Sequence, residues 1–238
     1  MSDRTPSSTS LGVWPEPLWP ISSQGLTSHG LDSHPWRRTV YLLTLAALTS
    51  APYGAAMGSW HGGRLAFYAA VKLPMLLIMT WALVFPFGWM INRVAGASLR
   101  TQDLAVASVH PILGASLALL ALVPVNLLFT RSFPLPDPSQ PQNHNALYVI
   151  HVVAVAACGC LATGSLRRLL IKDLGGTGAW LHLGWLMIFA LVAGEMGWAL
   201  RPFIGNPYES VTFLRNDAFD GNVYEFIWTD VLPRLLNK

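Results

Sequence analysis

Apolar residues gather in five long runs along this chain of 238 residues, and short polar stretches separate them. The runs cover residues 39–60, 65–92, 104–130, 146–166 and 180–200. A helix needs about 20 residues to cross the hydrocarbon core of a bilayer. In lipid a helix satisfies its backbone hydrogen bonds internally, whereas an open strand leaves its backbone groups without partners. The pattern therefore predicts an all-α fold, a polytopic membrane helical bundle with about five transmembrane helices.

The two ends of the chain differ from this apolar middle. Residues 1–36 are rich in Ser, Pro, Gly, Thr and His, which predicts a flexible N-terminal tail. The bundle is then expected over residues 37–202, and a C-terminal tail over residues 203–238. Within that tail the apolar residues recur at helical spacing, which predicts a short amphipathic helix at the membrane interface. They are Phe219, Val223, Phe226, Ile227 and Val231.

Prolines and small residues qualify the picture of uniform helices. Pro52, Pro74, Pro86, Pro111 and Pro124 lie inside the runs, and each is expected to kink its helix because it lacks a backbone donor. The first run has the clearest candidate for a break, just after Pro52. In the fourth run, two rows of small residues recur every four positions, which favours close helix packing and predicts that this helix is the buried centre. The rows are Ala154, Cys158, Ala162 and Ala156, Cys160, Gly164.

Charge is scarce and unevenly placed. Charged residues make up 11% of the chain and hydrophobic residues 53%, against about 25% charged in a typical soluble domain. These values exclude a soluble globular domain and a largely disordered chain. One side of the expected bundle carries only Arg64 and Arg131 in its loops, whereas the other carries eight basic residues. Because Lys and Arg mark the cytoplasmic side, we expect a cytoplasmic N-terminus and an external C-terminal tail. The eight are Arg4, Arg37, Arg38, Arg93, Arg100, Arg167, Arg168 and Lys172.

Two ionisable residues inside the runs are candidates for a functional pair. Lys72 lies seven residues into the second run, and Glu195 lies five residues before the end of the fifth. These positions place both at a depth of roughly 8–10 Å below the same surface. Charge inside a membrane is costly, so such residues usually pair or face water. We expect an ion pair, which either fixes helix register or forms a proton or ion site.

Histidines offer a second polar set, with His110 on the third run, His151 on the fourth and His182 near the start of the fifth. Two imidazoles at matched depth on different helices can hold a b-type haem. His110 and His182 meet the depth condition, so haem b is one interpretation. The other is that all three histidines are polar side chains satisfied within the core. No metal site is expected, because the two cysteines have no second Cys pair.

The most distinctive segment is EMGWALRPFIGNP at residues 195–207. It predicts a helix that ends after Trp198 and exits through Arg201, Pro202, Phe203 and Gly205. At this level Arg201 can bind lipid phosphates or the last helix carbonyls. Pro202 stops the helix, and the glycine and following proline turn the tail back over the bundle. We interpret this exit motif as an architectural lid.

This segment, together with VKLP at residues 71–74, resembles a family of bacterial multi-pass membrane proteins without established activity, sometimes labelled Yip-like or actin-binding. The resemblance covers roughly residues 41–224 and implies a bundle of about five helices in a bacterial membrane. With the distribution of Lys and Arg, we expect an inner-membrane protein with a periplasmic C-terminus. It supplies no catalytic residues. In that family the position of Glu195 is usually Gln, so the charge here is a departure. No actin-binding motif is visible in the tail.

No motif of a soluble enzyme is present, so we expect a chain that is not an enzyme. The preferred hypothesis is an accessory or scaffold subunit of a larger membrane complex, with the bilayer and other membrane subunits as partners and no nucleic acid. The alternative is a small transporter or channel that uses Lys72 and Glu195. A haem-binding electron carrier is the third hypothesis.

Overall fold

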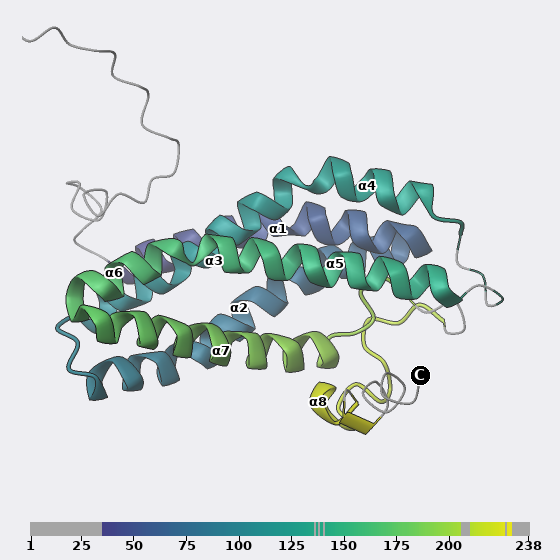
Figure 1. Cartoon of the computed structure of the whole chain (residues 1–238). Helices are drawn as coiled ribbons and strands as arrows, with labels where there is room; N and C mark the ends of the chain where they lie inside the picture. The colour runs from purple at the N-terminus through teal and green to yellow at the C-terminus, as the bar shows by residue number, and fades with distance from the viewer. Residues whose placement is uncertain are drawn as a thin grey trace, which may run out of the picture. The chain divides into compact units, whose positions relative to one another are not determined.

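The computed structural model describes residues 35–135, 137, 139, 141–205, 210–226 and 228–229, with backbone alone at 141–145 and 226. These residues form helices and no strand, which confirms the predicted all-α fold (Figure 1). The expected tail at residues 1–36 lies almost wholly outside the described residues, as do Ile227 and Val231 of the expected amphipathic helix. The elements are α1 (Pro35–Gly58), η1 (Ser59–His61), α2 (Gly63–Val94), α3 (Thr101–Ala121), α4 (Val123–Ser132), α5 (Pro141–Ala162), α6 (Gly164–Leu174), α7 (Gly176–Ala199) and α8 (Val223–Phe226).

Five helical stretches are long and apolar enough to cross a membrane, as the sequence predicted. Each overlaps one of the five apolar runs, and the third stretch ends at Ala121, nine residues before the end of its run. Satisfied backbone hydrogen bonds make helix the stable form for such runs in lipid. The stretches are Pro35–His61, Gly63–Val94, Thr101–Ala121, Ala146–Leu174 and Gly176–Ala199.

The helices bend at places that the sequence predicted only in part. The third run divides at Leu122, and Pro124 is the second residue of α4, where its missing N–H costs little. The first run does not break after Pro52, because α1 continues to Gly58. The glycines there allow close packing instead: a Cβ on Gly54 would lie 2.3 Å from the Ala69 carbonyl oxygen of α2.

The fourth run ends in a second helix rather than a loop. α5 stops at Ala162, and α6 follows after Thr163. The basic residues Arg167, Arg168 and Lys172, which were expected in a connecting loop, therefore lie on α6. Leu166 and Leu170 alternate with them and are buried, which gives α6 one apolar and one basic side.

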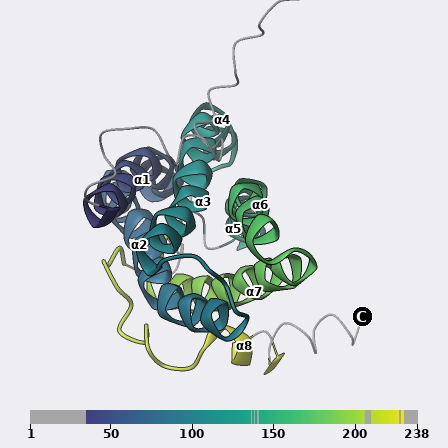
Figure 2. The same ribbon diagram turned by 90° about the vertical axis from the view of Figure 1, so that its left-hand side faces the viewer.

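The buried centre is α3, and the prediction that the fourth run holds this place was wrong. In α3, 72% of the most apolar window is buried, against 17% in the Ala146–Leu174 stretch. Figure 2 shows α3 between α1 and α2 on one side and α5 and α6 on the other. Only one edge of α5 faces the bundle. Cys158 of one small-residue row is on that edge, whereas Ala156 and Cys160 of the other row are exposed.

Two clusters of core residues mark the two ends of the bundle. The end of α2, the start of α3, α6 and the start of α7 meet around Leu170 and Trp185, and we call this the α6 end. At the opposite end, which we call the exit end, α1 and η1 meet α5 around Trp60, Leu147 and Ile204. Ile204 comes from the segment that follows α7, so that segment belongs to the core.

Candidate functional site

The chain turns back into the bundle after α7, and the predicted exit motif forms part of the core. Pro202 follows the end of α7, and Phe203 packs against buried apolar residues of α1, α2, α3 and α5. Ile204 is only 3% exposed. Gly205 has φ +86°, and a Cβ there would lie 2.7 Å from Leu65. The motif therefore fills the exit end from within.

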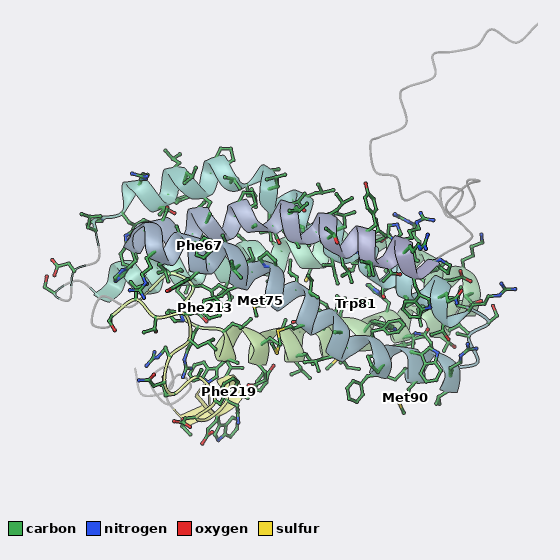
Figure 3. The ribbon with its side chains drawn as sticks, turned by 180° about the vertical axis from the view of Figure 1, so that it is seen from behind. Phe67, Met75, Trp81, Met90, Phe213 and Phe219 are labelled. Carbon is green, nitrogen blue, oxygen red and sulfur yellow. The ribbon has the colours of Figure 1, made fainter. Side chains whose placement is uncertain are left out.

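Lys72 meets this segment from α2. Its side chain is fully buried, and its Nζ donates a hydrogen bond to the Pro202 carbonyl oxygen at 2.8 Å. Nζ also lies 5.8 Å from the centre of the Phe203 ring and 5.2 Å from that of Phe213. Figure 3 shows Phe213 lying over α2, to which Lys72 belongs. A backbone carbonyl and two aromatic faces thus take the place of a carboxylate around this amine.

The expected ion pair between Lys72 and Glu195 is not formed: within the described residues no salt bridge joins them, and Lys72 bonds to Pro202. Glu195 is half-buried on α7, next to Gly194, against which Tyr224 of α8 packs. The Tyr224 hydroxyl donates to the Leu191 carbonyl at 2.5 Å. Burial, followed by the nearby Glu195 carboxylate, raises the pKa of Tyr224. Equal depth did not decide the pairing, because rotation about the helix axis sets which neighbour a side chain faces.

Trp198 and Arg201 connect the end of α7 to the tail. The Arg201 guanidinium carbon lies 3.4 Å from the centre of the Trp198 ring. Its Nη2 pairs with the Asp217 carboxylate at 3.3 Å, and Arg215 pairs with the same carboxylate at 2.9 Å. Burial raises the pKa of Asp217, but Arg215, a hydrogen bond from the Asp217 backbone and Arg201 together outweigh it and hold the pKa below its usual range. Arg201 thus binds a tail carboxylate, whereas the sequence suggested phosphates or helix carbonyls.

The three histidines lie in separate surroundings. His110 Nδ1 bonds to the Val106 carbonyl of its own helix at 2.8 Å. His151 Nδ1 is 3.0 Å from the Tyr53 hydroxyl. His182 is buried, and its Nδ1 has no hydrogen-bond partner among the described residues. No hydrogen bond or ring contact joins two of these histidines in that part of the chain, and haem ligation by His110 and His182 stays a prediction.

Sequence reasoning missed a buried polar network that joins α1, α4 and α5. Besides the contact between Tyr53 and His151, Asn126 donates to the Tyr53 carbonyl at 3.3 Å. Thr130 donates to the Asn126 side chain at 3.0 Å. A signal was present: Tyr53 lies seven residues before the end of the first run, and His151 lies five residues after the start of the fourth, so both lie at a similar depth. Comparing depths below the membrane surface, which gave the wrong partner for Lys72, would have paired Tyr53 with His151.

Together these contacts indicate a structural role for the site, because its polar groups bind other parts of the same chain. In the described ranges no three His, Cys, Asp or Glu side chains gather as metal ligands do. The polar groups of the exit end instead engage the backbone and side chains of the same chain, at Pro202, Asp217 and Tyr53. Comparisons with protein-family models, with curated proteins and with solved structures found no match.

Proposed function

We propose that this chain is a non-catalytic, multi-pass protein of the bacterial inner membrane that serves as an accessory or scaffold subunit of a larger membrane complex. The five apolar helices support a membrane-embedded protein. The eight-to-two distribution of basic residues supports a cytoplasmic N-terminus and a periplasmic C-terminus. The self-contained exit site supports a structural rather than a chemical role.

The observation that carries the proposal is the uncovered face of α5. The other residues that the structure describes cover little of this helix, and Val149, Val153 and Leu161 are 58%, 60% and 84% exposed. Between these large residues lie the small, exposed Ala156 and Cys160. Lipid tails cover large apolar side chains well, whereas small side chains allow another helix backbone to approach closely. A face that mixes both kinds is suited to a helix of a second subunit.

The transporter alternative has less support. It needs Lys72 and Glu195 to share one polar path, but Lys72 bonds to the Pro202 carbonyl and lies between Phe203 and Phe213. Glu195 lies beside Tyr224 instead. The two charges therefore have different neighbours, and a path through both would require the exit segment to leave the core.

Native purification tests the proposal directly. The tagged full-length chain is extracted gently from its own membranes, and co-purifying proteins are identified and quantified by mass spectrometry. We expect membrane proteins in a fixed ratio to the chain. A monodisperse lone monomer would contradict the accessory role. Flux in proteoliposomes that is abolished in Glu195→Ala would favour the transporter.

The two cysteines provide a matched pair for locating the partner. Cys160 is exposed on α5, whereas Cys158, two residues away, is buried against α3. Thiol-directed crosslinking in native membranes is compared between Cys158→Ala, which keeps Cys160, and Cys160→Ala, which keeps Cys158. We expect an adduct with a partner only in the first variant. Equal crosslinking in both, or none in either, would show that this face of α5 is not the contact.

A bulky substitution gives an independent readout. Ala156→Phe adds volume to the exposed small-residue row and is expected to reduce partner recovery, because it keeps a neighbouring helix away. Leu48→Phe, which adds volume at a position of α1 that is 66% exposed, serves as the control on a different helix. Loss of partner in both variants alike would contradict a specific role for α5.

A further inference from the structure

The basic side of α6 is an exposed charged surface that the proposed accessory role does not use. Leu166 and Leu170 are 5% and 0% exposed and bury the apolar side of the helix. Arg167, Arg168 and Lys172 are exposed on the other side. The packing of the helix against the bundle therefore fixes which way its charges face.

Close contacts hold α6 in place on both sides. A Cβ on Gly178, near the start of α7, would lie 2.1 Å from the Leu170 carbonyl oxygen, so the two backbones nearly touch. The Asp173 carboxylate accepts a hydrogen bond from the Ser98 backbone N–H at 3.0 Å and another from the Ser98 hydroxyl. The one acidic residue of α6 thus binds the α2–α3 connection, which carries Arg100 two residues further on.

The length of the fourth apolar stretch places this surface at the level of the lipid headgroups. The stretch begins at Ala146, and Arg167 lies 21 residues further on, about 32 Å along the helices. The hydrocarbon core is about 30 Å thick, so the basic residues of α6 begin where the hydrocarbon ends. Tryptophans favour the boundary between hydrocarbon and headgroups. Trp36, Trp89 and Trp180 stand at the same α6 end, at the start of α1, near the end of α2 and at the start of α7, and are 47%, 37% and 76% exposed.

Basic residues outnumber acidic ones at this level. Among the residues that the structure describes, the other exposed cations of the α6 end are Arg37, Arg93 and Arg100, and the exposed acid is Asp103. Guanidinium groups bind phosphate through two parallel hydrogen bonds and are well suited to a headgroup. Clusters of Lys and Arg immediately beyond a membrane span attract anionic lipids.

We propose that the basic side of α6, with the neighbouring arginines of α2 and its connection to α3, binds the phosphate headgroups of anionic phospholipids. The ligand is a phosphodiester held at the membrane surface, with its acyl chains along the apolar helices. Lipid binding at α6 does not require a partner subunit, so this proposal is tested independently of the accessory role.

The test uses the full chain in mixed micelles with phosphatidylcholine alone or with added phosphatidylglycerol. Retention of phosphatidylglycerol is measured by native mass spectrometry, and thermal unfolding by circular dichroism. The variant is Arg167→Gln/Arg168→Gln/Lys172→Gln. The control is Arg64→Gln/Arg131→Gln, which removes two cations at the exit end.

We expect wild type and control to retain phosphatidylglycerol and to melt at a higher temperature in its presence. The triple variant is expected to bind it about 10- to 100-fold more weakly, because each cation near a membrane surface contributes to anionic lipid binding. Equal retention in wild type and triple variant would overturn the proposal. So would the same thermal shift with inorganic phosphate alone, which would identify a free anion as the ligand.

Two further measurements keep the test decisive if the triple variant folds poorly. In wild type, raising the salt concentration from 0.05 to 0.5 M is expected to release phosphatidylglycerol, since salt screens exposed charges (roughly 10 Å screening length at 0.1 M). Retention that is unaffected by salt would count against the proposal. Arg167→Lys/Arg168→Lys keeps the charge and is expected to retain the lipid; loss in this variant together with loss of helix would indicate a structural role instead.

Discussion

Replacing Lys72 by Met is expected to loosen the C-terminal tail while leaving the bundle folded. The change removes the donor to the Pro202 carbonyl, which lies 2.8 Å from Nζ, and the contacts with the Phe203 and Phe213 rings. A buried acceptor left without a partner costs about 1–3 kcal/mol, and each ring contact contributes about 0.5–2 kcal/mol.

The free-energy cost of burying the Lys72 cation opposes these losses, and it determines whether Lys72→Met affects the whole bundle or only the tail. Burying a cation costs several kcal/mol, and Met, of similar length, avoids this cost without leaving a large cavity. The two terms largely cancel for unfolding of the whole bundle, so we expect its melting temperature to change little. Opening of the tail alone moves Phe213 and the exit segment away from α2 but leaves Lys72 beside the rest of the bundle, so the cation recovers only part of its hydration and the lost carbonyl bond is only partly offset. We expect opening to become about 5- to 150-fold more frequent, the equivalent of about 1–3 kcal/mol.

A thiol reporter measures this opening. Ala218 lies in the tail and is 2% exposed, so Ala218→Cys in a background without Cys158 and Cys160 reacts with a water-soluble maleimide only when the tail opens. The labelling rate is compared between the reporter chain that keeps Lys72 and the same chain with Lys72→Met or Thr80→Val. Thr80 is buried two turns further along α2, and its hydroxyl has no partner among the described residues, so that variant is the control. An unchanged rate in Lys72→Met would refute the view that Lys72 holds the tail.

Three more predictions follow from contacts in other parts of the bundle. Tyr53→Phe removes the hydroxyl next to His151 and is expected to cost about 1–3 kcal/mol, measured as a lower midpoint in thermal unfolding; an unchanged midpoint would contradict a role for this bond. Gly178→Ala forces α6 and α7 apart and is expected to lower the free energy of unfolding by about 1–3 kcal/mol. Gly184→Ala, on α7 with open space around it, is the control and is expected to be neutral. Equal melting curves for the two variants would argue against close packing at Gly178. Because the pKa of Asp217 is lowered in the folded chain, the stability that its carboxylate contributes is present above the unfolded pKa of about 3.9 and is lost as pH falls through the folded pKa. The thiol of Ala218→Cys should therefore label faster in acid, after correction for thiol reactivity. Asp217→Asn should remove this pH dependence.

Hydrophobic pattern predicted the five spans because long apolar runs have one stable form in lipid. It also predicted the bend near Pro124, where a missing donor is visible in the sequence. It could not predict which run lies at the centre, because two rows of small residues on α5 look alike, yet only the row with Cys158 packs on α3. Small residues allow close packing without specifying the neighbour.

The candidate site shows the same limit at the level of single residues. Lys72 was correctly singled out as an unusual buried charge, but its partner is a backbone carbonyl, and every residue carries one. Nothing in the sequence marks the Pro202 carbonyl as the acceptor. The exit motif was recognisable as a place where the helix stops, whereas the burial of Phe203 depends on four other helices and follows only from the assembled bundle.

The position of Phe203 also bears on how the protein is made. The ribosome produces α1, α2, α3 and α5 long before it reaches residue 203, so these helices enter the bilayer while the exit end has no filling. Their mutual packing there is completed only when the final spanning helix has been inserted and the segment after it has folded back. A nascent chain that stops short of this segment would therefore lack the contacts of Phe203 and Ile204 that complete the core at the exit end.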